Sequence, residues 1–347
     1  MLLSLAGQAK YRLLLQLLCI TSCLLICCFF LKLPRMTPPP NIYVSQGIKP
    51  PSQRVWEPLC PPGYSSESFT SKLLEEQKKR LDHVLKICNK TRNRGRFRTT
   101  MARNILVDDY NKVLYCVIPK VACTTWKKYF SKISPLRIGN NLKNLNVHNW
   151  KSLRRAGYNY LHTYNRTEIH HRLDNYFKFM FVRDPFVRLL SAYREKFQLH
   201  NKYTRFFHRT FGQTIIARYR LNSSREERRA GNDVRFEEFI QYILELKDRD
   251  EEFNPHWDSF HELCHPCAIN YNFIGKLETM QQDTQFIMQK ISNSSTCQKI
   301  PMLFVRSSTT ETVMKKYYSK ISHAAIDELK ELYNMDFQLF NYSKAPL

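Results

Sequence analysis

Residues 113–129, VLYCVIPKVACTTWKKY, constrain the fold of this chain more than any other stretch. Residues 113–118 are apolar, β-branched or aromatic apart from the small Cys116, which is typical of a buried strand. Pro119 should end that strand because proline has no N–H to donate to a ladder. The amphipathic run that follows predicts a helix, so a strand, a tight turn and a helix stand in direct succession.

The turn between this strand and this helix has the composition of an anion-binding loop. Lys120 supplies a charge, small residues follow, and Thr124 and Thr125 add hydroxyl groups at the helix start. A strand–loop–helix junction directs backbone N–H groups and the positive end of a helix dipole at one point, which suits a phosphate or sulfate. The alternative is an ordinary turn with a threonine N-cap. The Walker pattern is absent, because no glycine-rich loop precedes the lysine.

A second strand–turn–helix unit lies downstream, in FMFVRDPFVRLLSAYREKF at residues 179–197. Arg183 leaves the strand, Pro185 suits a first helical turn, and Ser191 follows within the helix. Arginine makes forked, charge-assisted contacts to phosphate and serine adds one hydroxyl. The alternative is an ion pair of Arg183 with Asp184 or Glu195.

The two motifs together resemble the nucleotide-binding loops of sulfotransferases that use 3′-phosphoadenosine 5′-phosphosulfate (PAPS). The resemblance implies that the first loop binds the 5′-phosphosulfate and the second, from its arginine to its serine, the 3′-phosphate. The implied residues of the first loop are Lys120, Val121, Ala122, Cys123, Thr124, Thr125 and Trp126. Those of the second are Arg183, Asp184, Pro185, Phe186, Val187, Arg188, Leu189, Leu190 and Ser191.

Further motifs narrow the resemblance to the Golgi carbohydrate sulfotransferases of the HNK-1 and chondroitin/GalNAc 4-O-sulfotransferase family. They are His256-Trp257, LCHPC at 263–267 and DFQLFNYS at 336–343. The resemblance covers roughly residues 100–347. Thr125 and Val187 depart from the usual Asn and Glu of the family, which leaves the subfamily open.

The resemblance implies sulfation of a glycan hydroxyl. The acceptor is expected to be O4 of N-acetylgalactosamine, in chondroitin- or dermatan-type chains or in GalNAc-terminated N-glycans. HNK-1-type sulfation of glucuronic acid is the alternative within the family.

The start of the chain predicts a membrane anchor. Residues 13–31 are uncharged and long enough to span a bilayer, and no small-residue cleavage site follows, so we expect an uncleaved signal-anchor rather than a signal peptide. Residues 1–12 are then a cytosolic tail, 32–99 a lumenal stem whose first half is rich in proline, and 100–347 the catalytic domain. All five Asn-x-Ser/Thr sequons follow the span, which supports a single-pass type II protein of the Golgi membrane. They are Asn89, Asn165, Asn222, Asn293 and Asn341.

The rest of the chain alternates strand-like and helical patterns. Strands are expected at 104–107, 113–118, 177–182 and 272–276. Helices are expected near 67–90, 123–133, 185–199, 235–247, 279–291 and 323–334. This alternation predicts an α/β fold with a central, mainly parallel sheet, and the resemblance specifies the P-loop-like sulfotransferase fold. Both anion motifs then fall at the carboxyl ends of strands, where such folds bind ligands.

The formal net charge of +24 indicates a polyanionic partner or a membrane surface. No nucleic-acid motif is present, and an acidic glycan or glycosaminoglycan fits a lumenal body better. The alternative is a solvated basic surface.

Seven cysteines follow the predicted span, so at least one is unpaired or joins two chains. They are Cys60, Cys88, Cys116, Cys123, Cys264, Cys267 and Cys297. The Cys264-His-Pro-Cys267 motif favours a local disulfide over a zinc site, since a structural site needs a second pair of ligands. Cys123 is interpreted as a small packing residue.

Sulfuryl transfer needs stabilisation of the leaving phosphate, a base for the acceptor hydroxyl, and alignment of both. Lys120 is expected to take the first role, and no metal is required. His256 is the candidate base because Trp257 beside it could stack on a sugar ring. Its competitors are His148, His162, His170, His171 and Glu278.

Two other functions are compatible with parts of the sequence. A lumenal glycosyltransferase would use Asp248-Arg-Asp250 to hold a metal and nucleotide sugar, although these residues also suit a solvated helix end. A non-catalytic glycan-binding protein would have no use for the second anion motif.

Overall fold

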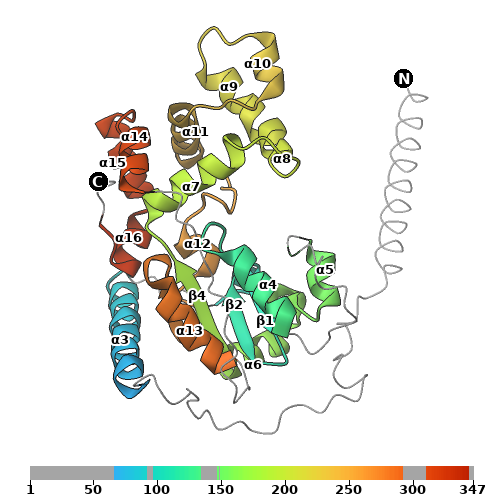
Figure 1. The fold of residues 1–347 in the computed structure, drawn as a ribbon, viewed down its shortest axis with the longest axis vertical. Coiled ribbons are helices and arrows are strands. Elements are labelled where there is room, and N and C mark those ends of the chain that lie inside the picture. The colour runs from blue at the N-terminus through green and yellow to red at the C-terminus, as the bar shows by residue number, and fades with distance from the viewer. Residues whose placement is uncertain (1–65, 92–96, 134–146, 148, 292–309, 344–347) are drawn as a thin grey trace, which may run out of the picture. The chain divides into compact units, whose positions relative to one another are not determined.

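The structure, a computed structural model, is shown in Figure 1. It describes residues 66–91, 97–133, 147, 149–291 and 310–343. The predicted tail and membrane span, residues 1–31, lie outside this part of the chain. No helix within it is long and apolar enough to cross a membrane.

A five-stranded sheet in the order β3-β1-β2-β4-β5 lies at the centre. Its strands are Ile105–Asp108 (β1), Val113–Cys116 (β2), Asn159–Tyr160 (β3), Phe177–Val182 (β4) and Phe273–Lys276 (β5). The central pairs β2–β4 and β4–β5 are parallel, whereas β1 pairs antiparallel with both β2 and β3. The predicted α/β class with a central, mainly parallel sheet is therefore confirmed.

The antiparallel β1–β2 pair follows from the short turn between the two strands. Asp108 accepts hydrogen bonds from the backbone and side chain of Asn111, and Lys112 has a positive φ of 54°. A connection of this length can close only a hairpin, because a parallel crossover needs a dozen or more residues.

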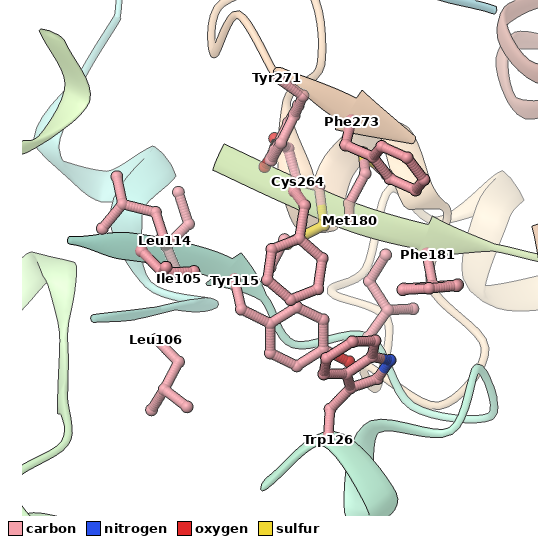
Figure 2. Close-up of a cluster of buried hydrophobic side chains, with 14 of the residues drawn as sticks. Ile105, Leu106, Leu114, Tyr115, Trp126, Met180, Phe181, Cys264, Tyr271 and Phe273 are labelled. Carbon is pink, nitrogen blue, oxygen red and sulfur yellow. Dashed lines mark hydrogen bonds between the residues drawn. A yellow bond between two sulfur atoms is a disulfide. The ribbon is translucent and has the colours of Figure 1, made fainter. Parts of the chain in front are cut away.

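The sheet core is aromatic. Tyr115 of β2 stacks on Phe179 of β4 with 4.8 Å between ring centroids. Trp126 packs between them and Phe181, at 5.3 Å from the latter ring (Figure 2). Strands covered on both faces read as continuous apolar runs, which is why the sequence pattern located β2 and β4.

The helices surround this sheet. The α-helices are Ser66–Lys90 (α3), Cys123–Ile133 (α4), Trp150–Arg155 (α5), Arg166–Asn175 (α6), Pro185–Phe197 (α7), Arg205–Phe207 (α8), Gln213–Tyr219 (α9), Arg225–Ala230 (α10), Phe236–Asp248 (α11), Phe260–Cys264 (α12), Met280–Ile291 (α13), Glu311–Tyr318 (α14), His323–Leu332 (α15) and Asn334–Phe340 (α16). Short 3₁₀ turns cover Thr99–Ala102 (η1), Leu161–Thr163 (η3) and Leu277–Thr279 (η5), and a π-helical turn covers His208–Gly212 (η4).

A second hydrophobic core lies beyond the carboxyl ends of the parallel strands. Helix α7 begins directly after β4 and buries Phe186, Leu189 and Leu190 against α11 and α14 to α16. Figure 1 shows these helices together at the end of the sheet where β4 leads into α7, with α6 at the opposite end. The two cores therefore meet where both anion motifs lie.

Helix α3 covers the exposed edge of β5. Gln77 accepts from the Ile274 N–H at 3.1 Å, and Arg80 donates to the Ile274 carbonyl at 3.0 Å and to Asp283 at 2.9 Å. These side chains satisfy backbone groups that an edge strand would otherwise expose. The division between stem and catalytic domain near residue 100 stays a prediction. Helix α3 precedes this boundary in the sequence, yet it packs on the catalytic body.

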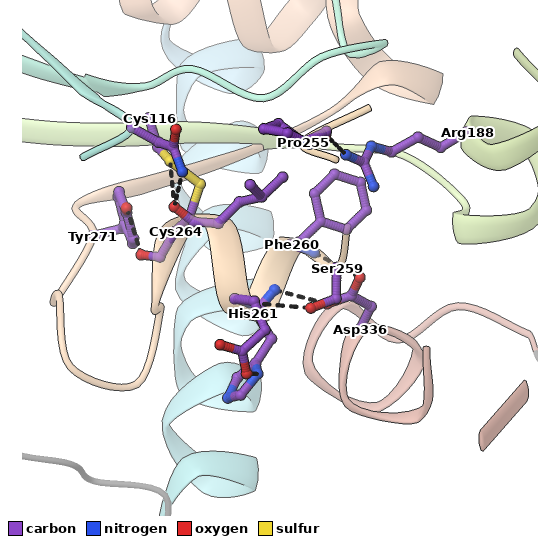
Figure 3. The surroundings of a disulfide bond; sticks show 12 residues. Cys116, Arg188, Pro255, Ser259, Phe260, His261, Cys264, Tyr271 and Asp336 are labelled. Carbon is purple, nitrogen blue, oxygen red and sulfur yellow. Dashed lines mark hydrogen bonds and ion pairs between the residues drawn. A yellow bond between two sulfur atoms is a disulfide. The ribbon is translucent and has the colours of Figure 1, made fainter. Parts of the chain in front are cut away.

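Two disulfides correct the expected local bridge. Cys116 of β2 pairs with Cys264 (Figure 3). Cys88 of α3 pairs with Cys267. The predicted Cys264–Cys267 disulfide is wrong. Helix α12 ends in a left-handed turn at His265, with φ of 45°, which separates the two cysteines. Cys264 is bonded to β2 and Cys267 to α3. Both thiols are consumed, which also excludes the zinc alternative at this motif. Cys123 is a free, half-buried thiol, and Cys60 and Cys297 lie outside the described residues.

The disulfides yield the first prediction. Mass spectrometry of unreduced, proteolysed protein should find Cys88 linked to Cys267 and Cys116 linked to Cys264. Cys88→Ser should lower the free energy of unfolding by about 2–5 kcal/mol, because it releases a constraint on the unfolded chain. Cys123→Ser is the matched control and should have little effect. A Cys264–Cys267 peptide would contradict the assignment.

Candidate active site

The first anion motif forms a strained turn between β2 and α4. Lys120 and Ala122 both have left-handed backbone conformations, with φ of 74° and 64°. Each such residue costs roughly 1–2 kcal/mol when it is not glycine, so surrounding contacts must hold the turn. The Ala122 carbonyl accepts from the amides of Thr125 and Trp126 at 3.0 and 3.1 Å, which begins the helix immediately. Alternating left-handed residues before a helix N-terminus gather backbone N–H groups into an anion-binding concavity.

The Lys120 ammonium group pairs with a carboxylate from the second motif. Its Nζ contacts Glu195 of α7, whose other oxygen lies 2.8 Å from Lys196 Nζ. Burial lowers the pKa of Lys120, against the opposing effect of Glu195. Burial disfavours the Glu195 carboxylate, but the two lysines outweigh it and lower its pKa to about 2. A carboxylate oxygen of Glu195 therefore contacts Lys120 at the position where the phosphosulfate is expected to bind.

Arg188 joins the anion loop to the loop that carries His256. It is 2% exposed, and its Nε donates to the Pro119 carbonyl at 3.1 Å. Its two terminal nitrogens donate to the carbonyls of Pro255, at 2.8 Å, and Asp258. Figure 3 shows the guanidinium reaching Pro255 beside Phe260, whose ring lies 4.7 Å away. Although the resemblance includes Arg188 in the nucleotide-binding range, its guanidinium makes three hydrogen bonds to the protein's own backbone.

Arg183 lies at the end of β4, on the strand next to β2. It is 6% exposed, and burial lowers its pKa while Glu278 and Asp184 favour its charge. Asp184 caps α7 by accepting from the Val187 N–H at 2.9 Å, and burial raises the pKa of this carboxyl to about 6. Ser191 is half-buried two turns further along α7. Glu195, one of the ion-pair partners considered for Arg183, contacts Lys120 and Lys196.

The apolar members of both predicted loops anchor the turns in the two cores. Their side chains are buried: Val121, Trp126, Phe186, Leu189 and Leu190. They leave only backbone groups for a ligand. The side chains with partial exposure are those of Lys120, Ala122, Cys123, Thr124, Thr125, Asp184, Val187 and Ser191.

His256 lies within the electrostatic influence of Lys196 of α7 and Lys120 of the anion loop. Asn254 Oδ1 contacts its Nδ1 at 2.8 Å and accepts its backbone N–H at 3.1 Å. Because an amide oxygen only accepts, Nδ1 carries the proton and Nε2 keeps its lone pair. Burial, followed by the charges of Lys196, Arg188 and Lys120, lowers the pKa of His256 to about 3. The imidazole is therefore neutral, and its Nε2 is a hydrogen-bond acceptor.

Trp257 does not take the expected role beside His256. It is 1% exposed and packs edge-on against Phe211 and Phe239, at 5.1 and 5.5 Å. Its carbonyl accepts from the Tyr333 hydroxyl at 2.6 Å. The prediction that its ring stacks on a sugar is wrong, because the second core encloses it.

The competing base candidates lie elsewhere. The exposed His162, His170 and His171 lie on η3 and α6, which leads into the amino end of β4, away from Lys120. Glu278 accepts from the Asp184 N–H at 3.2 Å and belongs to the Arg183 end. His148 is outside the described residues. Asp248 and Asp250, of the glycosyltransferase alternative, are exposed at the end of α11.

A large cavity adjoins the His256 loop without containing the anion motifs. Its volume is about 1230 Å³, and its lining includes Arg103, Lys247, Pro255, Asp258 and His261. Lys120, Arg183, Ser191 and His256 do not line it. The candidate active site is therefore separate from this cavity and is defined by the contacts of Lys120, Arg188 and His256 described above.

Comparison with known proteins assigns the family. Residues 103–343 match the sulfotransferase family. The chain belongs to this family. It is 35% identical over 315 residues to carbohydrate sulfotransferase 11 of Mus musculus, covering 87% of this chain and 84% of that protein. It is 37% identical over 278 residues to carbohydrate sulfotransferase 8 of Homo sapiens, covering 78% and 63%. No solved structure matches.

Family membership confirms the resemblance drawn from the motifs and implies PAPS as the sulfate donor. The 36% identity to carbohydrate sulfotransferase 14 of Danio rerio, over 71% of this chain and 64% of that protein, agrees with it. Among the described residues, no three histidine, cysteine or acidic side chains gather as they would around a metal ion.

Two contacts of this sulfotransferase chain were not predicted from its sequence, that of Glu195 with Lys120 and those of Arg188. A signal was present in the spacing of Arg188, Ser191 and Glu195. Steps of three and four residues place side chains on one face of a helix. That face of α7 is the one directed at the anion loop.

The position of His256 predicts a pH dependence of stability. The unfolded chain binds a proton on this residue below its usual pKa of about 6.5, whereas the folded chain binds it only near 3. Stability is therefore lost as pH falls through this window. His256→Gln removes the effect. As pH falls from 7 to 5, the free energy of unfolding of the variant should therefore rise relative to that of the wild type, by up to about 1.4 kcal/mol per pH unit.

Urea unfolding at several pH values measures this difference, with the exposed His162→Gln as the matched control. A gap between wild type and His256→Gln that stays constant with pH would show that His256 is not held neutral by its surroundings.

Proposed function

We propose that this sulfotransferase moves the sulfuryl group of PAPS to a hydroxyl of a glycan, at O4 of N-acetylgalactosamine. The contact between Lys120 and Glu195 carries the proposal, because it joins the two anion motifs at one place. Parallel strands β2 and β4 are neighbours, so both motifs lie at the same edge of the sheet. One nucleotide could then bridge them.

The residues at this edge fit the donor. Lys120, the hydroxyls of Thr124 and Thr125 and the N-terminus of α4 would hold the 5′-phosphosulfate, and Arg183 and Ser191 the 3′-phosphate. PAPS supplies a sulfuryl group on a good leaving phosphate. When Lys120 turns from the Glu195 carboxylate to this phosphate, its charge stabilises the negative charge that develops as the bond to sulfur breaks.

His256 is proposed as the base. Its Nε2 lone pair would take the proton of the acceptor hydroxyl as the new oxygen–sulfur bond forms, while Asn254 holds the opposite nitrogen at 2.8 Å. Burial is the main cause of the low pKa of His256, and an anion bound on Lys120 would offset the smaller effect of the neighbouring cations. Binding of the donor therefore raises the basicity of His256 when the base is needed.

The acceptor and the location rest on other grounds. The relatives named above are carbohydrate sulfotransferases, and the N-acetylgalactosamine position rests on the resemblance of the motifs. We propose chondroitin- or dermatan-type chains, or GalNAc-terminated N-glycans, as the acceptors. We also propose a Golgi type II protein anchored by residues 13–31. The sequon residues Asn89, Asn165, Asn222 and Asn341 are exposed, which suits lumenal glycosylation.

Substitution of the two basic residues tests the proposal. Lys120→Ala should reduce kcat at least about 100-fold, because a charge that acts in the transition state is lost. Arg183→Ala should chiefly raise KM for PAPS, because it removes a forked contact to the 3′-phosphate. Radiolabelled PAPS with desulfated chondroitin as the acceptor gives both constants.

Two variants control this experiment. Lys128→Ala removes an exposed charge from α4, the helix that follows the anion loop, and should leave both constants unchanged. Lys120→Ala combined with Glu195→Gln shows whether the loss comes from the missing cation or from the carboxylate left behind. Normal turnover in Lys120→Ala would refute the role of this lysine.

A further inference from the structure

An exposed aromatic and basic face lies next to the proposed base, on residues 199–209. Tyr203 is 68% exposed and Phe206 60% exposed, and Leu199 is also half exposed. Lys202, Arg205 and Arg209 are exposed among them. We call these residues, from the end of α7 through α8 into η4, the 199–209 face. Figure 1 shows α8 where the chain continues from α7.

The charge of this face is unbalanced. No acidic residue occurs between Glu195 and Glu226 in the sequence. Within the described chain, Lys202, Arg205 and Arg209 make no ion pair, whereas Arg218 and Arg220 further along are paired with Glu245 and Glu238. The basic side chains of the 199–209 face are therefore available to an anionic partner.

The face is held in place by the core beneath it. Phe207 is buried between the two exposed basic positions and packs against Trp257. The Thr204 hydroxyl donates to the Leu199 carbonyl at 2.7 Å, which closes the turn before α8. Gly212, at the end of η4, lies so close to Gly231 that an added Cβ would come within 1.9 Å of its carbonyl oxygen. A π-helical turn of this kind is frequent at functional sites.

The face is one residue away from the proposed reaction centre. The ring of Phe206 is 5.5 Å from that of Phe207, which in turn is 5.1 Å from the imidazole of His256. Lys196 Nζ lies 4.5 Å from the Phe207 ring and contacts Glu195, the partner of Lys120. A chain molecule whose hydroxyl group reaches His256 would therefore extend across this face.

We infer that the 199–209 face binds the anionic glycan acceptor, with Lys202, Arg205 and Arg209 holding acidic groups of the chain and Tyr203 and Phe206 stacking on its sugar rings. The inference rests on the proposed function and adds the residues that select the acceptor. Cations make strong, charge-assisted bonds to carboxylates and sulfates, and aromatic faces provide a flat apolar surface for sugar C–H groups. An acidic polysaccharide presents both features in alternation.

The test compares two double variants of the full-length, detergent-solubilised chain. Arg205→Ala/Arg209→Ala should raise KM for desulfated chondroitin about tenfold or more, because two charge-assisted bonds are lost. The rate with a neutral GalNAc-terminated oligosaccharide and KM for PAPS should stay within about twofold. Tyr203→Ala/Phe206→Ala should raise KM for both acceptors. Added salt should weaken chondroitin use less in the arginine variant than in the wild type.

The matched control is Arg225→Ala/Arg229→Ala, which removes the same charge from exposed positions of α10. An equal rise in KM in this control would show that total charge decides, and would overturn the inference. So would an unchanged KM for chondroitin in Arg205→Ala/Arg209→Ala. A third overturning result is loss of binding to phosphatidylserine-containing vesicles in this variant without a change in KM, because the face would then contact a membrane.

A binding measurement separates this inference from the proposed function. The affinity of the full-length protein for fluorescent desulfated chondroitin needs no turnover. If the wild type transfers no sulfate but Arg205→Ala/Arg209→Ala still binds chondroitin about tenfold more weakly, the face stands and the reaction is wrong. If transfer occurs but affinity is the same in both proteins, the face is wrong and the reaction stands.

Discussion

The buried Arg188 guanidinium is the contact on which the site depends. It donates to carbonyls of two separate loops, Pro119 of the anion turn and Pro255 and Asp258 on either side of His256. A buried cation is unfavourable unless its donors are satisfied, and here backbone oxygens and the Phe260 ring replace water. One rigid, planar group thereby joins the loop that carries Lys120 to the loop that carries His256.

One face of helix α7 contacts the anion loop, and another packs in the second hydrophobic core. Arg188, Ser191 and Glu195 face the anion loop, while Phe186 and Leu190 fill the second core. The end of the chain completes the support: Asp336 accepts from the Phe260 and His261 amides at 2.7 and 2.9 Å, at the start of α12. The DFQLFNYS motif that contributed to the resemblance thus contains a residue that fixes the element following His256. Its role is structural support for the site.

Local patterns predicted local structure well, and distant partners were out of reach. The strand–turn–helix unit at 113–129 is found where it was expected, because proline, apolar periodicity and helix-start residues act within a few positions. The disulfide of Cys88 joins residues separated by 179 positions, and no short-range signal names its partner. Trp257 looked available for a ligand because the sequence does not show that Phe211 and Phe239 converge on it. The Glu195 contact to Lys120 could have been suspected from helical spacing, but only the fold brings the two together.

The central claim is that the turns at Lys120 and Arg183 hold the two ends of one nucleotide. A structure of the protein with adenosine 3′,5′-bisphosphate, the product that remains of PAPS, tests it most directly. The account predicts the 5′-phosphate on Lys120 and the first turn of α4, with Glu195 displaced, and the 3′-phosphate on Arg183 and Ser191. A nucleotide in the cavity lined by Arg103 and His261, with the Lys120–Glu195 contact intact, would contradict it.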